Sequence, residues 1–167
     1  TEEAVYPISF GADVQMNLTN RLKAGTGLEF TLLSSRSTVF QSPGYIDYRF
    51  KRGYVGIPLY GQLDITKGKK TSWFVKGGLI SELGVFRTVN YSAYDIVGDL
   101  PRDEGGSGIL GMQFAGTFST GLNYSITDQV RLYGELSTKT YFYFSHYTPY
   151  MDQAIWPGLK LGMAWDL

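Results

Sequence analysis

The chain has 167 residues and no net formal charge, and its charged fraction of 18% is below the roughly 25% of ordinary soluble domains. This length suits one domain with its own core, the charge balance gives no footprint for nucleic acid, and the lack of cysteine excludes disulfides, thiolate metal sites and cysteine nucleophiles. No apolar run reaches the roughly 18 residues of a transmembrane helix. The first residues carry no signal-peptide pattern, so we interpret the sequence as a mature chain or a fragment.

Residues 8–33 alternate between apolar and polar side chains on both sides of a turn at Thr19, Asn20 and Arg21. Because successive side chains of a strand point to opposite faces, this pattern predicts a β-hairpin with one apolar face. Each arm has about 11 residues, the length that a tilted strand needs to cross a bilayer.

The same alternation recurs in five more segments, which are residues 52–65, 73–85, 113–124, 130–143 and 158–167. Tight turns are predicted at residues 67–70 and 127–129, and no segment has the pattern of a helix. Alternating strands joined by turns indicate an all-β antiparallel barrel or sandwich. Pro58 would normally exclude a central strand, so we expect a bulge or an unpaired position there.

The tight turns alternate with three long connections, predicted as loops at residues 34–47, 87–111 and 145–157. Outer-membrane barrels have short periplasmic turns and long external loops. The alternation of loop lengths therefore favours an up-and-down transmembrane β-barrel over a sandwich or a soluble barrel.

The polar face of the predicted strands carries charges of both signs in equal number. They are Asp13, Lys23, Glu29, Arg52, Asp64, Lys76, Glu82, Arg131, Glu135, Lys139, Lys160 and Asp166. A narrow barrel fills its interior with side chains, and buried charges must be paired, so we expect a polar network inside the barrel. The alternative is that a neutral protein has balanced charges everywhere.

The apolar face would then contact lipid. The predicted lipid-facing residues are Ile8, Phe10, Val14, Met16, Leu22, Leu28, Phe30, Val55, Ile57, Leu59, Val75, Leu79, Leu83, Phe118, Leu122, Leu132, Leu136, Leu159, Leu161 and Met163. Trp73, Tyr124 and Trp165 lie near the tight turns and Phe114 and Phe142 near the long connections, which is typical of two aromatic girdles. The alternative is that aromatic residues are simply good strand formers.

Residues 7–11, 21–35, 54–59 and the closing strand carry a resemblance to a known family. The sequence resembles the small outer-membrane β-barrel proteins of Gram-negative bacteria, with an OmpA- or OmpX-like barrel plan, and more closely the PorT-like outer-membrane β-barrel family. The resemblance covers nearly the whole chain. Because its motifs are strand patterns, it implies the fold and a location in the bacterial outer membrane, and it implies hardly anything about biochemical activity.

The predicted strands number seven, whereas an antiparallel barrel closes with an even number because its first and last strands must also pair antiparallel. We expect residues 1–167 to form a single barrel domain on an eight-stranded plan, whose first strand lies upstream of residue 1. The alternatives are a strand within residues 1–6 or a long loop, and a strand supplied by a partner chain.

Two groups of polar residues are candidates for a catalytic site and a metal site. Ser145, His146 and Asp152 contain the residue types of a lipid hydrolase or acyltransferase, but adjacent strand residues do not present their side chains to each other. Asp95, Asp99, Asp103 and Glu104 are calcium-ligand types without a calcium-loop spacing, so solvated charge is the preferred interpretation. We predict no catalytic residue, no metal and no cofactor.

A cluster of aromatic residues lies near the last long connection. Tyr143, Tyr147, Tyr150 and Trp156 are of the types that dominate binding hot spots and form a candidate external binding surface. The alternative is an aromatic belt with loop packing.

The sequence thus predicts an integral outer-membrane protein without enzymatic activity, and without an open pore because a barrel of eight strands is filled by its own side chains. Its role would be structural, binding or accessory within a membrane complex, with outer-membrane lipid and other outer-membrane or periplasmic proteins as partners. The alternatives are a lipid-modifying enzyme of the outer membrane and a soluble, lipocalin-like binder with an apolar cavity.

Overall fold

The structure, a computed structural model, describes residues 2–3, 7–41, 44–94, 100–106, 111–144 and 155–167. These residues form strands and their connections, and none forms a helix that could span a membrane. The strands are β1 (Glu2–Glu3), β2 (Ile8–Asn17), β3 (Leu22–Gln41), β4 (Gly44–Lys67), β5 (Thr71–Tyr94), β6 (Leu100–Gly106), β7 (Met112–Ser125), β8 (Val130–Phe144) and β9 (Trp156–Asp166). The predicted all-β class is therefore confirmed.

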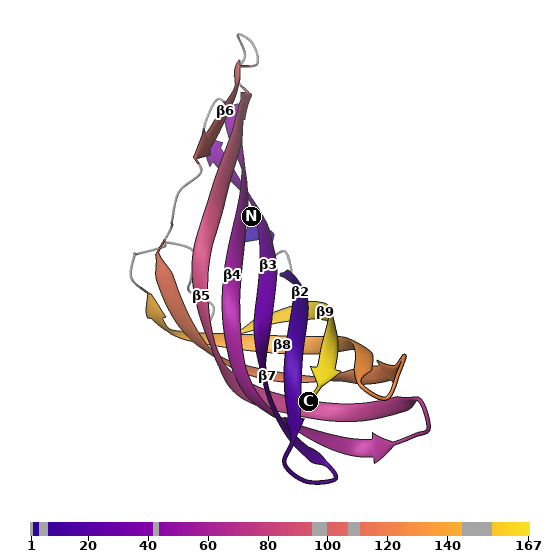
Figure 1. Cartoon of the computed structure of the whole chain (residues 1–167). Coiled ribbons are helices and arrows are strands. Elements are labelled where there is room, and N and C mark those ends of the chain that lie inside the picture. Colours follow the sequence, from indigo (N-terminus) through magenta and orange to yellow (C-terminus); the bar gives the residue numbers. More distant parts are fainter. Residues whose placement is uncertain (1, 4–6, 42–43, 95–99, 107–110, 145–154) are drawn as a thin grey trace.

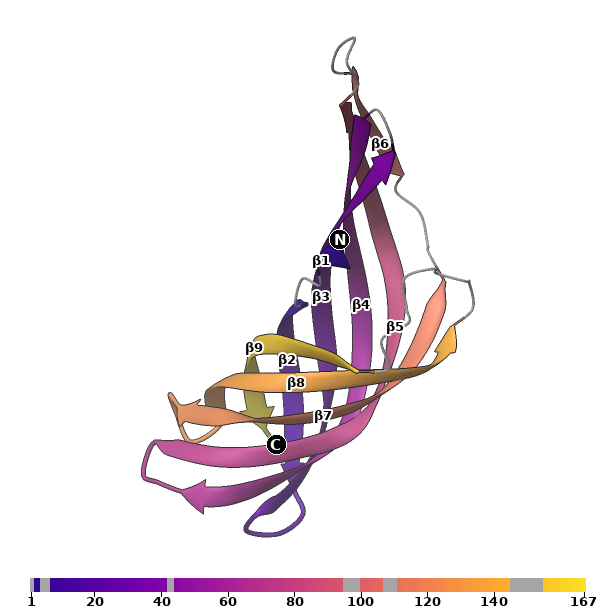
Figure 2. The same cartoon turned by 180° about the vertical axis from the view of Figure 1, so that it is seen from behind.

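Seven strands pair into a closed ring in the order β2, β3, β4, β5, β7, β8 and β9, and we call this ring the barrel. Its strands curve around one another in both views (Figures 1 and 2). Six of the interfaces are antiparallel, but β9 returns to β2 as a parallel partner, from Ile8 opposite Leu159 to Gln15 opposite Asp166.

The expectation that the first and last strands must pair antiparallel is therefore wrong. A parallel ladder is only slightly less stable per residue than an antiparallel one, whereas an open ring would leave two rows of unpaired backbone groups. Residues 2–3 do form a strand, but it pairs with Arg36 and Ser37 of β3 and does not lie between β2 and β9. A further strand upstream of residue 1 stays a prediction.

Three strands continue well beyond the barrel. Strands β3, β4 and β5 have 20, 24 and 24 residues, against 10 in β2. Their extensions, residues 34–41, 44–51 and 87–94, form with β1 and β6 a sheet that rises above the other strands (Figures 1 and 2). We call it the projecting sheet.

Two of the predicted loops are therefore wrong, because residues 34–41 and 44–47 and most of residues 87–106 are strands. These segments contain β-branched and aromatic residues such as Val39, Phe40 and Ile46, which favour strands once a neighbouring strand supplies a ladder. Of the third predicted loop, residues 145–154 lie outside the described residues, and Trp156 already belongs to β9.

The pairing of β4 is irregular at three places, of which the shift between Asp64 and Thr66 lies near the tight turn and the other two lie farther along the strand. Gly53 pairs with Phe86 but Tyr54 pairs with Gly84, so β5 carries one extra residue where the barrel meets the projecting sheet. The ladder between β3 and β4 is interrupted opposite Pro58, where the Thr26 hydroxyl donates to the Pro58 carbonyl at 2.8 Å. Since proline has no N–H to donate, this confirms the predicted unpaired position on the β3 side, whereas on the β5 side Pro58 pairs with Ile80.

Candidate functional site

The inner face of the barrel holds the charged residues that the alternation assigned to it. Eleven of the twelve are buried, and Asp166 has 16% of its side chain exposed. Among the side chains that the structure describes, ion pairs join every one of them except Arg52. Because buried charges must be compensated, this set makes the barrel interior a single candidate site, which we call the inner network.

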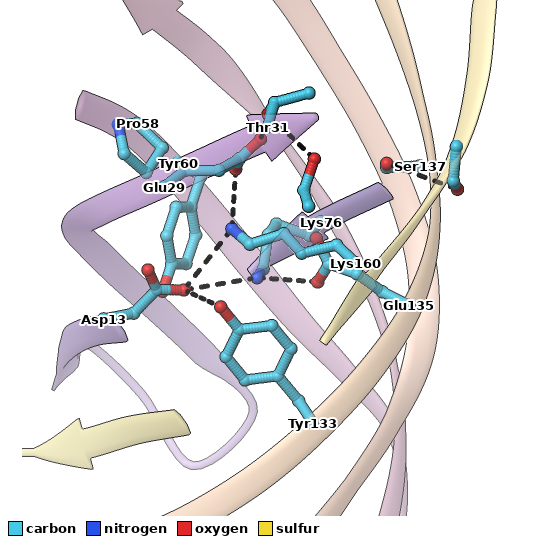
Figure 3. A network of polar contacts seen from close by, with 12 residues as sticks. Asp13, Glu29, Thr31, Pro58, Tyr60, Lys76, Tyr133, Glu135, Ser137 and Lys160 are labelled. Atoms are coloured by element: carbon cyan, nitrogen blue, oxygen red, sulfur yellow. Dashed lines mark hydrogen bonds and ion pairs between the residues drawn. The ribbon is translucent and has the colours of Figure 1, made fainter. Parts of the chain in front are cut away.

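Asp13 of β2 is the centre of the inner network (Figure 3). Its Oδ2 accepts hydrogen bonds from the hydroxyls of Tyr60 at 3.1 Å and Tyr133 at 2.9 Å. Tyr60 lies on β4 and Tyr133 on β8, two strands away from β2 on either side. One carboxylate therefore connects five consecutive strands across the parallel β2–β9 pair.

Two lysines lie close to this carboxylate. The Nζ atoms of Lys76 and Lys160 are each 3.8 Å from Asp13 Oδ2, and they pair more closely with Glu135 at 2.8 Å and Glu29 at 2.9 Å (Figure 3). Lys76 Nζ also lies 4.2 Å from the centre of the Tyr60 ring, which is within range of a cation–π interaction. The two cations compensate part of the charge of the three carboxylates, and Glu29 also pairs with Lys139. The ring faces replace part of the water that burial removes.

Lys139 is the centre of the next layer toward the projecting sheet. Its Nζ is 2.6 Å from Glu29 Oε1 and also pairs with Glu82. Glu82 further accepts hydrogen bonds from Gln113 at 2.8 Å and from the Tyr141 hydroxyl at 2.9 Å. This ammonium therefore separates two carboxylates that would otherwise face each other.

A third layer lies near the tight turns. Arg131 pairs with Asp166 and donates to Gln15 Oε1 at 2.5 Å, and Lys23 Nζ is 3.4 Å from Asp64 Oδ2. Gln15 and Gln62 join the two pairs by a hydrogen bond of 3.0 Å. Polar contacts therefore fill the barrel section by section.

Several members of the inner network were not among the predicted site residues. They lie on the same face of their strands as the charged residues, so the alternation of side chains is enough to identify them. These residues are Gln15, Tyr60, Gln62, Tyr133 and Tyr141. Parity could not show that Tyr133 extends over glycine. A Cβ on Gly162 would meet the Tyr133 ring and, at 2.5 Å, the Gly11 carbonyl oxygen, so only glycine leaves the space through which Tyr133 reaches Asp13.

The outer face of the barrel is apolar. All twenty residues predicted to face lipid have exposed or half-buried side chains, among them Leu59 at 66% and Leu136 at 67% exposure. Trp73, Tyr124, Trp165 and Phe142 are exposed, and Phe114 is half-buried. Phe86, which was not predicted, covers Gly53 on this face and lies 6.4 Å from Phe30 between ring centres.

The other predicted sites lie wholly or partly outside the described residues. The structure does not describe Asp95, Asp99, Ser145, His146, Tyr147, Tyr150 and Asp152. It describes only the backbone of Asp103, Glu104, Tyr143 and Trp156. The described residues contain no cluster of metal-ligating side chains.

The chain matches no family model, no curated protein and no solved structure. The fold and the inner network by themselves define this protein as a seven-stranded β-barrel with a charged interior and an apolar exterior. Most of the buried charges in this interior are compensated by a neighbouring charge of opposite sign.

Proposed function

We propose that this chain is an integral β-barrel of the bacterial outer membrane, of the PorT-like kind that its sequence resembles. The barrel crosses the bilayer without an open pore, and the projecting sheet extends from the outer surface. The role is structural, binding or accessory within a membrane complex.

The observation that carries this proposal is the apolar band on the outer face of the barrel. On β3 the outward residues are apolar or uncharged from Leu22 to Leu32, and Ser34 and Arg36 follow them in the projecting sheet. Ten residue steps of ~3.4 Å, tilted by ~40°, give a band about 26 Å tall, close to the roughly 25 Å apolar band of outer-membrane barrels. A soluble barrel of lipocalin type would place its apolar face inside, where this chain has its ion pairs.

A leucine in the middle of the band tests the proposal. Leu136→Arg places a charge on the outer face, which costs about 2–4 kcal/mol at the midplane of a bilayer and almost nothing in water. We expect this variant to lose most of its insertion into phosphatidylcholine vesicles, measured by heat-modifiable migration on gels. The matched control is Asn90→Arg, which adds the same charge on the projecting sheet and should insert like the wild type.

Two outcomes would contradict the proposal. One is a wild-type protein that stays monomeric at high concentration without detergent, with Leu136→Arg equally stable, since this would indicate a soluble barrel. The other is stable porin-sized conductance in planar bilayers, because side chains fill the interior of so narrow a barrel.

A further inference from the structure

The outer face of the projecting sheet begins with basic residues directly above the apolar band. Rows of paired residues cross β3, β4 and β5 on this face, and the last apolar row is Leu32, Gly53 and Phe86. The next two outward rows are Ser34, Lys51 and Thr88, followed by Arg36, Arg49 and Asn90.

The height of these rows follows from strand geometry. Each row is two residues further along the strands, so the two basic rows lie ~7 Å and ~14 Å beyond the apolar band, or about 5 Å and 10 Å in height at a tilt of ~40°. The polar headgroup region is roughly 5–8 Å thick on each side of the hydrocarbon core. If the barrel is inserted as proposed above, the backbone of Lys51 lies at the level of the headgroups and that of Arg49 just beyond their outer edge.

Acidic residues of this face pair with Arg36 and Asn90 rather than with Arg49 or Lys51: Glu3 of β1 lies opposite Arg36 and Asp103 of β6 lies opposite Asn90, at the two ends of the second row. Arg36 and Arg49 lie directly opposite each other, and like charges in this position destabilise a sheet. Asp47 offsets Arg36, with its Oδ2 2.6 Å from Arg36 Nη2. Within the described residues, Arg49 and Lys51 make no ion pair, and both are exposed.

We propose that Arg49 and Lys51 form a binding site for the phosphate groups of membrane lipid headgroups. This inference rests on the proposed membrane location. An arginine can hold phosphate with two parallel hydrogen bonds and a lysine adds a point charge, while Ser34, Thr88 and Asn90 supply hydroxyl and amide donors in the same rows. The continuity of the basic rows with the apolar band assigns the phosphate to lipid, since the acyl chains would lie on Leu32 and Phe86.

The experiment compares lipid binding by the wild type, Arg49→Gln, Lys51→Gln and the double variant. The proteins are folded into nanodiscs of phosphatidylcholine, and pyrene-labelled phosphatidylglycerol, which has an anionic headgroup, is titrated in and detected by energy transfer from tryptophan. Since one basic residue near an anionic surface strengthens attraction roughly fivefold, we expect a rise in Kd of about fivefold in each single variant and about 25-fold in the double variant.

Arg87→Gln is the matched control. Arg87 is exposed and adjacent to Thr88, but it pairs with the buried Arg52, which places it on the opposite face of the same sheet. Its removal changes the net charge by the same amount as Lys51→Gln and should leave the Kd unchanged. An equal loss of binding in Arg87→Gln, or unchanged binding in the double variant, would overturn the proposal.

Two further measurements separate the explanations. Insertion into vesicles of pure phosphatidylcholine, detected by heat-modifiable migration on gels, tests the proposed membrane location independently of the headgroup site. Normal insertion without any preference for the anionic lipid therefore contradicts only the headgroup site. Titration of inorganic phosphate in neutral detergent tests the other source of phosphate. Binding as tight as that of the lipid, and lost in the double variant, would overturn the assignment to lipid.

Discussion

The barrel and the projecting sheet share the strands β3, β4 and β5, but the outer face of these strands is apolar in the barrel and polar in the projecting sheet. In the barrel, β3, β4 and β5 bury charged residues such as Glu29 and expose leucines. In the projecting sheet, Arg49 and Lys51 are exposed on the outer face of β4, and Phe50 is buried on its inner face. The antiparallel pairing continues through both regions, so the backbone ladder does not depend on which face is apolar.

The outer face changes from apolar to polar over a few residues. Gly53 and Phe86 form the last outward apolar pair, and the extra residue in β5 lies beside them. A strand pattern therefore reports two separate properties. Its period gives the secondary structure, whereas the side on which the apolar residues lie gives the surroundings of each segment.

Lysines of the two regions should differ most in their contribution to the free energy of unfolding, which Lys139→Met tests. Removing this buried ammonium leaves Glu29 and Glu82 without their shared cation, and loss of one partner of a buried pair costs about 3–5 kcal/mol. We expect a loss of this size in the free energy of unfolding, measured by guanidinium titration of tryptophan fluorescence. Lys51→Met on the projecting sheet removes the same side chain from an exposed position and should change the stability little. Similar losses in both variants would mean that the inner network is not what stabilises the barrel.

The junction between the regions can be tested through Gly53→Ala. A Cβ at this position would meet the Phe86 ring, with Cδ1 and Cζ both at 2.6 Å, so the ring must leave Gly53 and its contact with Phe30. Overpacking of this kind costs about 1–3 kcal/mol. Gly77→Ala is the control on the outer face of the barrel, where the nearest atom is 3.9 Å away, and it should be neutral or stabilising by up to ~1 kcal/mol. Equal unfolding midpoints for the two variants would contradict a packed junction.

The sequence is informative where the pattern is local. Alternation alone places Asp13 and Glu29 on one face and Leu28 on the other, because parity depends only on neighbouring residues. The tight turns are equally local, since Thr19 and Thr127 each accept backbone hydrogen bonds within their own turn. These features needed no knowledge of which strands meet.

Other features depend on contacts between distant segments. The parallel pairing of β2 with β9 joins the two ends of the barrel, and no property of either strand specifies its direction relative to the other. The extension of β3 through Ser34 and Ser35 was predicted as a loop because the apolar face ends there, although the ladder continues. The convergence of Tyr60 and Tyr133 on Asp13 likewise requires the closed ring.

The smallest expected effect concerns Asp47 on the projecting sheet. Hydrogen bonds from Arg36, and then from Thr38, lower the pKa of this carboxyl from its ordinary value of 3.8. A lowered pKa in the folded state means that the stabilisation is present above the ordinary value and is lost as the pH falls through the folded pKa. We therefore expect the pairing between residues 36–38 and 47–49 to weaken below about pH 4, while the barrel stays folded.

Hydrogen exchange of these amides between pH 6 and pH 3, corrected for the intrinsic rate, measures this change. The effect should be only a few-fold in protection, because exposed ion pairs contribute little to stability. Asp47→Asn cannot titrate, so its protection should be low at both pH values and show no step. A step of the same size in Asp47→Asn would assign the transition to another group. A much larger loss that includes β2 and β9 would mean that the inner network, rather than the projecting sheet, responds first to acid.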